Sequence, residues 1–234
     1  IRDMERTLSR LSQGSGNARD LKSLEVSLLK IPDVKEHLDA IQGGELAERL
    51  QRKLGDFAEL AALLEKALVD EPPAGLKEGG IFADGYSREI DELRRGASEG
   101  KQWIAQLQVQ EQDRTGIPSL KVKYNNVFGY FIEITKTHLD KVPPEYTRKQ
   151  TMANAERFIT PELKEMENKI LGADERLRAL EYEEFLNLRE TVLEHLEAIQ
   201  TTASALAEID VLVSFAEVAR LFGYSRPVLN DTRN

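Results

Sequence analysis

A polar stretch in the second half of the chain carries side chains that suit binding to phosphate groups. Arg148 and Lys149 are followed by the neutral donors Gln150, Thr151 and Asn154. Phosphate oxygens accept hydrogen bonds from charged and neutral donors alike, so this mixture favours contacts to a nucleic-acid backbone. A solvated loop that caps the next helix would have a similar composition, and residue types alone leave both interpretations open.

Aromatic residues lie beside lysines in the preceding stretch. Phe128, Tyr130 and Phe131 come shortly after Lys121 and Lys123. Such rings could stack on the bases of single-stranded nucleic acid. They more often form the hydrophobic face of a small sheet, and we favour that interpretation.

The charge of this region is opposite to that of the chain as a whole. Residues 114–160 hold eight Lys and Arg against four Asp and Glu, a net charge of +4, whereas the whole chain carries −9. The remainder therefore carries −13. Such a distribution would attract an anionic partner to one segment and repel it elsewhere. Chance clustering of charges on a solvated loop is the alternative.

Two glycines superficially resemble a phosphate-binding loop. Only three residues separate Gly96 from Gly100, whereas the loop needs four, and Gln102 lacks the hydroxyl that would hold magnesium. No strand is predicted before them. We interpret them as helix-interior glycines that permit close packing.

Other catalytic and metal-binding classes are not expected either. His37, His138 and His195 lie far apart without the spacing of a metal-binding helix, and no serine occupies a nucleophile-elbow pattern. The chain has no cysteine, which excludes disulfides and thiolate sites and favours a reducing compartment. No apolar run approaches the length of a membrane span. We therefore expect no enzymatic activity in this chain.

Helical patterns dominate the first half. Residues 1–70 are predicted to form several short helices, capped at Asn17 and Asp33, and Ser87 begins a long helix to about Asp113. The short helices are broken at 14–16, 31–32 and 43–44. The apolar seam of the long helix is Ile90, Leu93, Ala97, Gly100, Ile104 and Leu107. Its small residues lead us to expect a loose, hinged helix pair.

A short β region interrupts the helical pattern. Residues 120–124 alternate between apolar and basic, Asn125–Asn126 is a turn, and 127–134 is rich in β-forming residues, which predicts a hairpin. Thr160 then caps a second long helix, with apolar positions as far as Ile199. A last helix is predicted from about Thr202 to Phe222, ending at Gly223 with Pro227 beyond.

These elements predict a mainly α fold with a small β module. Two long antiparallel helices carry a small α+β module at their tip, because the connecting segment is too short to return the chain to the start of the first helix. A lone hairpin is marginally stable, so the module needs packing from the helix ends or from the chain after Thr135. The chain begins at Ile1 without an initiator methionine, and we expect it to be a fragment.

Two long stretches resemble a known family. Leu120–Thr135 and Tyr146–Glu165 closely resemble the clamp of the MutS DNA mismatch-repair family. Ser204–Leu212 is similar to the family's late lever helix, and further similarity near the start extends the resemblance over essentially the whole chain.

The resemblance implies an architecture and a set of binding residues. Residues 1–100 and 165–234 correspond to a discontinuous helical lever, and 101–164 to an inserted clamp that grips duplex DNA through its backbone. The implied DNA-binding residues are Lys121, Lys123, Arg148, Lys149, Gln150, Thr151 and Asn154. One departure is Ala153, where many members have lysine; Lys123 is expected to compensate for the missing charge.

The resemblance also implies functions of an intact protein. That protein would be a DNA-dependent ATPase that uses ATP and Mg²⁺, forms a homodimer and binds a MutL-type protein in the bacterial cytoplasm. No cofactor and no membrane are expected for the fragment itself. Two alternatives remain: a coiled-coil interaction module, or the same fragment of a MutS paralogue that acts in recombination.

Overall fold

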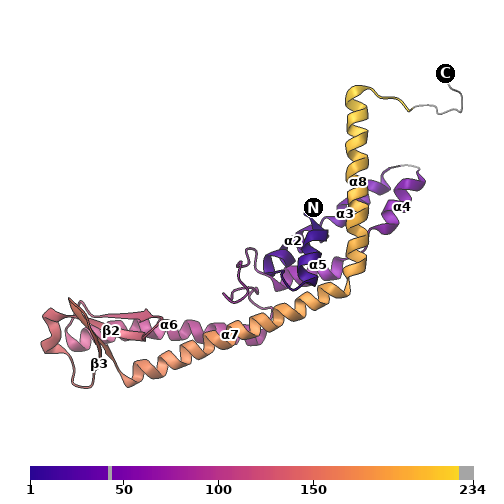
Figure 1. Ribbon diagram of the computed structural model, residues 1–234. Coiled ribbons are helices and arrows are strands. Elements are labelled where there is room, and N and C mark those ends of the chain that lie inside the picture. Colours follow the sequence, from indigo (N-terminus) through magenta and orange to yellow (C-terminus); the bar gives the residue numbers. More distant parts are fainter. Residues whose placement is uncertain (42–43, 227–234) are drawn as a thin grey trace. The chain divides into compact units, whose positions relative to one another are not determined.

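The computed structural model describes residues 1–41 and 44–226, which are mainly helical with one small antiparallel sheet (Figure 1). The predicted fold class is therefore confirmed. The chain divides into two compact units, one of residues 1–76, 80–83 and 184–234, the other of 77–79 and 84–183. This division does not test the lever and clamp boundaries, which stay a prediction. Within the described residues, no helix is both long and apolar enough to cross a membrane.

The first unit begins with the short helices predicted for residues 1–70. These are α1 (Met4–Ser12), α2 (Ala18–Leu28), α3 (Ile31–Asp39), α4 (Glu45–Lys53) and α5 (Ala58–Ala67). The Asn17 side chain accepts the backbone N–H groups of Arg19 and Asp20, so the predicted cap of α2 is confirmed.

The cap predicted at Asp33 is wrong. Helix α3 already begins at Ile31, and Asp33 lies in its first turn, paired with Lys30 at 3.2 Å. Pro32 explains the earlier start, because its fixed φ suits the first helical turn. The predicted break at 43–44 falls partly on residues outside those described.

The two last helices divide at a different residue from the predicted one. Helix α7 (Pro161–Glu194) ends before His195, and α8 (Leu196–Phe222) follows it, so Ile199 belongs to α8. Thr202 does not start a helix. Its buried hydroxyl instead makes tertiary contacts, accepting the Gly55 N–H at 2.9 Å and donating to the Lys53 carbonyl at 3.2 Å.

The end of α8 is as predicted. Gly223 adopts φ +63°, the left-handed conformation that ends a helix. Pro227 lies outside the described residues.

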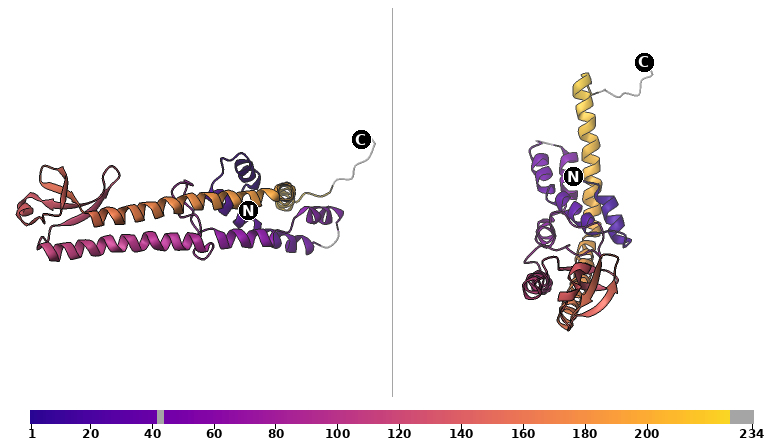
Figure 2. Two further views of the ribbon diagram at one scale, coloured as in Figure 1. Left: turned by 90° about the horizontal axis from the view of Figure 1, so that it is seen from below. Right: turned by 90° about the vertical axis from the view of Figure 1, so that its left-hand side faces the viewer.

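The second unit contains α6 and the larger part of α7, the predicted antiparallel pair of long helices. Helix α6 (Arg88–Thr115) is capped by Ser87, whose hydroxyl accepts the Ile90 N–H, and runs beside α7 (Figure 2). Two ion pairs cross between the helices, Arg94 with Glu181 at 3.3 Å and Lys101 with Asp174 at 3.9 Å. The residue numbers of the paired side chains rise along α6 and fall along α7, which confirms that the two helices are antiparallel.

Gly100 makes this pairing close. A Cβ atom at Gly100 would lie 2.3 Å from Ile170 Cγ1, whereas one at Gly96 would meet nothing within 4 Å. The expectation that Gly100 permits close packing is confirmed, and the expectation of a loose seam is wrong at this position. Small size here lets a large neighbour approach the backbone.

Four strands form the β module. The predicted hairpin is confirmed as β1 (Lys121–Asn125) and β2 (Gly129–Thr135), paired antiparallel. Residues 148–151, for which no strand was predicted, belong to β3 (Thr147–Thr151), which pairs with β4 (Ala155–Ile159). The strand order is β1-β2-β4-β3, so β3 is an edge strand. Most residues of β3 are exposed, so its sequence lacks the alternation of apolar and polar residues that would predict a strand.

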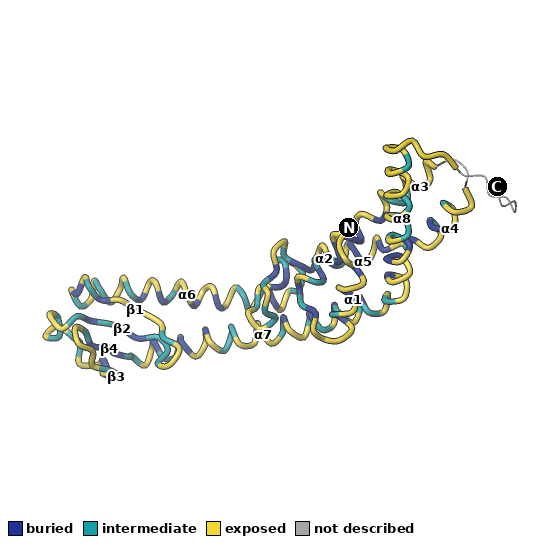
Figure 3. Tube along the Cα trace, turned by 45° about the horizontal axis from the view of Figure 1, so that its top comes forward, coloured by how far each residue is buried: buried dark blue, intermediate teal, exposed yellow. Residues whose placement is uncertain are grey.

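The core of this unit lies between the sheet and the two helices. Ile132 and Ile134 of β2 and Phe158 of β4 are buried on one face of the sheet. Buried stretches along β2 and β4 are dark blue in Figure 3. Helices α6 and α7 contribute further buried side chains to the same cluster, namely Ile104, Leu107, Leu163 and Ile170. Tyr146 joins it from the segment after η1 (Lys136–Lys141). The chain after Thr135 therefore supplies packing, as the marginal stability of a hairpin required.

Two alanine substitutions in α6 separate helix propensity from packing. Gly96→Ala should raise the free energy of unfolding by up to about 1 kcal/mol, because alanine is the better helix former. Gly100→Ala should lower it by about 1–3 kcal/mol, because the new methyl group overlaps Ile170. Thermal melting followed by circular dichroism measures both; an equal stabilisation of both variants would show that the helices do not meet at Gly100.

Candidate nucleic-acid interface

The two faces of the sheet differ in chemistry. Cross-strand partners share a face, and Lys121, Glu133 and Arg157 stand opposite one another on β1, β2 and β4. Lys123 points to the same face because it is two residues from Lys121. The opposite face carries Ile132 and Phe158 and is buried in the core. The sheet thus presents one charged face and one apolar face.

A single carboxylate holds two of the cations on the charged face. Lys123 Nζ donates to Glu133 Oε1 at 2.7 Å, and Arg157 Nε lies 3.4 Å from Glu133 Oε2. Arg157 also donates to the Gln150 Oε1 atom at 2.8 Å. The hydrogen bond from Lys123, more than any other contact, lowers the pKa of Glu133 below its ordinary value. Of the predicted binding residues, Lys123 and Gln150 are therefore engaged within the sheet.

Phe131 packs beneath this network. The Arg157 guanidinium lies 4.3 Å from the centre of the Phe131 ring, and the ring is only 2% exposed. Tyr130 is half-buried against the core cluster. The preference for a hydrophobic role over base stacking is confirmed for both residues.

The edge strand β3 holds the next group of predicted binding residues. Arg148 Nε lies 2.7 Å from Glu156 Oε2, a carboxylate that is almost completely buried. Lys149 sits where the register between β3 and β4 shifts, and its side chain is exposed. Thr151 and Asn154 are exposed at the turn that joins the two strands. The structure brings these residues together on one hairpin.

The cations of this region fall into two groups. In residues 114–160, all of which the structure describes, Lys123, Arg148 and Arg157 pair with carboxylates of the sheet, and Arg114 pairs with Glu111 and Glu145. Among the described residues, no carboxylate lies within 4.0 Å of Lys121, Lys136, Lys141 or Lys149. Lys136 and Lys141 belong to the basic segment but are not among the predicted binding residues. Their only signal was membership of the basic segment.

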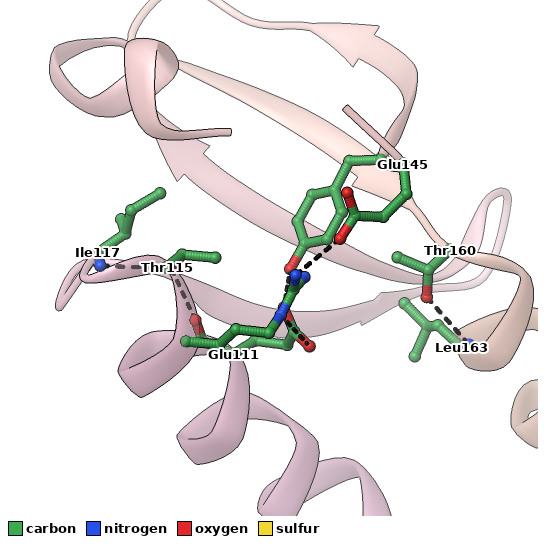
Figure 4. A network of polar contacts seen from close by, with 8 residues as sticks. Glu111, Thr115, Ile117, Glu145, Thr160 and Leu163 are labelled. Atoms are coloured by element: carbon green, nitrogen blue, oxygen red, sulfur yellow. Dashed lines mark hydrogen bonds and ion pairs between the residues drawn. The ribbon is translucent and has the colours of Figure 1, made fainter. Parts of the chain in front are cut away.

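Polar contacts attach the sheet to α6. Tyr146 donates its hydroxyl to Glu111 Oε2 at 2.5 Å, and Arg114 bridges Glu111 and Glu145 at 2.7 Å each (Figure 4). Burial, followed by the hydrogen bond to Glu111, raises the pKa of Tyr146, which keeps the hydroxyl protonated as a donor. These contacts fix the segment that leads into β3.

A second set of contacts attaches the sheet to α7. Lys164 Nζ donates to Glu167 at 2.7 Å and to the Phe128 carbonyl at 3.3 Å, and Glu167 Oε2 accepts the Tyr130 N–H at 2.5 Å. Gly129 has φ +74°, and a Cβ atom there would lie 2.3 Å from Oε2 of the Glu167 carboxylate. The turn between β1 and β2 is therefore fitted to this pair of side chains.

The arrangement offers cations and neutral donors to a ligand. Among the described residues, no group of three or more His, Asp and Glu side chains is placed to hold a metal ion. Exposed lysines, amides and hydroxyls bind anions by charge and hydrogen bonding. A polyanionic backbone is the kind of ligand that these groups suit.

Comparison with known proteins gives similarity to one family. Residues 85–176 match the family described as MutS family domain IV. The chain is 49% identical over 231 residues to the DNA mismatch repair protein MutS of Halothermothrix orenii and 50% identical over 232 residues to that of Symbiobacterium thermophilum. Each alignment covers 99% of this chain but 26% of the relative. The chain thus spans about a quarter of the length of these proteins.

The pKa of Glu133 provides a test of the charged face. Lys123→Met should raise that pKa toward its ordinary value of 4.5, because the main hydrogen-bond donor is lost. Lys141→Met should leave it unchanged. Carboxyl NMR titration measures both variants.

The same substitution should alter the pH dependence of stability. A carboxyl group whose pKa is lower in the folded state than in the unfolded state adds to the free energy of unfolding. That stabilisation is fully present above the pKa of the unfolded state and is lost as pH falls through the pKa of the folded state. The free energy of unfolding should therefore fall less steeply in Lys123→Met than in the parent chain below about pH 4.5. An identical Glu133 titration in both variants would contradict the pairing.

Proposed function

Because the chain belongs to the MutS family, we propose that it is the part of a DNA mismatch repair protein that grips duplex DNA through the phosphate backbone. The sheet and its turns make the contact. The observation that supports this most is the group of exposed lysines, Lys121 and Lys149 among them, that lack a carboxylate partner within residues 114–160. Repulsion by the −13 remainder of the chain directs DNA to this segment.

The predicted residues have unequal parts in the proposed contact. Lys121, Lys149, Thr151 and Asn154 are exposed and offer their donors directly. Lys123 and Arg148 must exchange a carboxylate for a phosphate, and each therefore contributes less net binding energy than a free lysine. Lys123 is thus poorly placed to replace a charge missing at Ala153.

The proposed contact carries no sequence information. Phosphates are the same at every base pair, so donors that reach only the backbone bind matched and mismatched duplexes equally. Mismatch recognition and nucleotide hydrolysis are assigned to other parts of an intact protein. We propose that the intact protein is a DNA-dependent ATPase that uses ATP and Mg²⁺. It would act in the cytoplasm as a homodimer with a MutL-type partner. The helices of this segment would link DNA binding to the ATPase part of that protein.

Salt dependence of DNA binding tests the proposal. If about four phosphates are neutralised, the logarithm of the association constant should fall against the logarithm of salt concentration with a slope near −3.6. Arg148→Ala combined with Lys149→Ala should weaken binding to matched and mismatched duplexes by the same factor and make the slope shallower. Fluorescence anisotropy with a labelled duplex measures both quantities.

The control and the contrary outcomes are distinct. Lys77→Ala removes an exposed lysine from the loop before α6 and should leave affinity unchanged. Affinity that stays constant from about 50 to 200 mM salt would reject phosphate binding and favour a protein-interaction module. Unequal losses on the two duplexes would show that β3 reads bases or distorted DNA.

A further inference from the structure

Lys136 lies beside the turn that carries the predicted binding residues, although it comes from a different segment. Thr135, the last residue of β2, pairs with Ala155, the first residue of β4. The next residue, Lys136, donates its backbone N–H to the Asn154 carbonyl at 3.1 Å. The start of η1 is thereby fixed against the β3–β4 turn.

A chain of hydroxyl groups lies at the same end of the sheet. Ser119 Oγ is 3.1 Å from Thr135 Oγ1, which is 3.0 Å from Thr137 Oγ1. Three hydroxyls carry three protons, and the two bonds between them use two. One O–H donor therefore remains, and it lies on the exposed Thr137 when both bonds run toward Thr137, whereas in the other arrangements it lies on Thr135 or Ser119.

The charge at this end is available to a ligand. Lys136 is exposed and has no carboxylate within 4.0 Å in the described part of the chain, and the Asn154 side chain is exposed next to it. By contrast, Lys123 is bound to Glu133 on the charged face of the sheet. An anion that approaches this end meets a free ammonium group and neutral donors without having to displace an acid.

We propose that Lys136, Thr137 and Asn154 form a subsite for one phosphate group of duplex DNA. Lys136 supplies the charge, and the hydroxyl chain and the Asn154 amide supply neutral hydrogen bonds. The inference rests on the proposed function and assigns two residues to the interface that the basic β3 stretch does not include. Because the Lys136 N–H donates to the Asn154 carbonyl, the two residues lie side by side and would contact the same stretch of the DNA backbone.

Removal of the Lys136 charge tests the subsite. Lys136→Ala should weaken binding of a labelled duplex and reduce the magnitude of the salt slope by about 0.9, the value for one released counterion. Lys136→Arg should retain both the affinity and the slope, because it keeps the charge. Thr137→Val should weaken binding without changing the slope, because it removes a neutral donor.

The controls separate this inference from the proposed function. Lys77→Ala is the matched lysine control: its neighbour Gly79 lies near Arg178 of α7, about 25 Å along the helix from Pro161. Lys136→Gln repeats the test if the alanine variant folds poorly, as judged by its melting temperature. Salt-dependent binding by the parent chain with no effect of Lys136→Ala or Lys136→Gln would overturn the subsite alone. Binding that does not depend on salt in the parent chain would overturn the proposed function itself.

Discussion

Four strands of five to seven residues make a sheet too small to hold a core of its own, so its apolar face must be covered by other elements. Helices α6 and α7 provide that cover, and they can do so together because Gly100 lets Ile170 approach the α6 backbone. Two sets of polar contacts complete the attachment, one through Tyr146 and Glu111 and the other through Tyr130 and Glu167. The position of every candidate binding residue depends on this packing.

The same packing determines which charges remain available to a ligand. Strand pairing places Glu133 between Lys123 and Arg157, and it places Glu156 beside Arg148, so these cations are neutralised within the sheet. The lysines at strand ends, at the register shift and in η1 have no such neighbour. Free positive charge therefore concentrates at the margins of the sheet.

Much of this unit could be predicted from sequence because local signals were strong. Ser87, Thr160 and Gly223 mark helix ends with recognisable chemistry, and alternation from Leu120 to Tyr124 identified the hairpin. Strand β3 gave no signal, because an exposed edge strand carries polar residues on both sides. The division at His195 also gave no signal, because no proline or glycine marks it and the His195 side chain makes no capping hydrogen bond. The basic residues could be identified, but which of them are free depends on strand register, and sequence does not fix that.

The central claim is that this packed sheet presents a phosphate-binding margin, and amide NMR of the 234-residue chain titrated with a duplex tests it most directly. The account predicts that chemical shifts change first at Lys121, Lys136, Lys149 and Asn154, and that added salt reverses the changes. The helices of residues 1–76 and α8 should keep their shifts. Changes concentrated in those helices, with the sheet margins unaffected, would contradict the account.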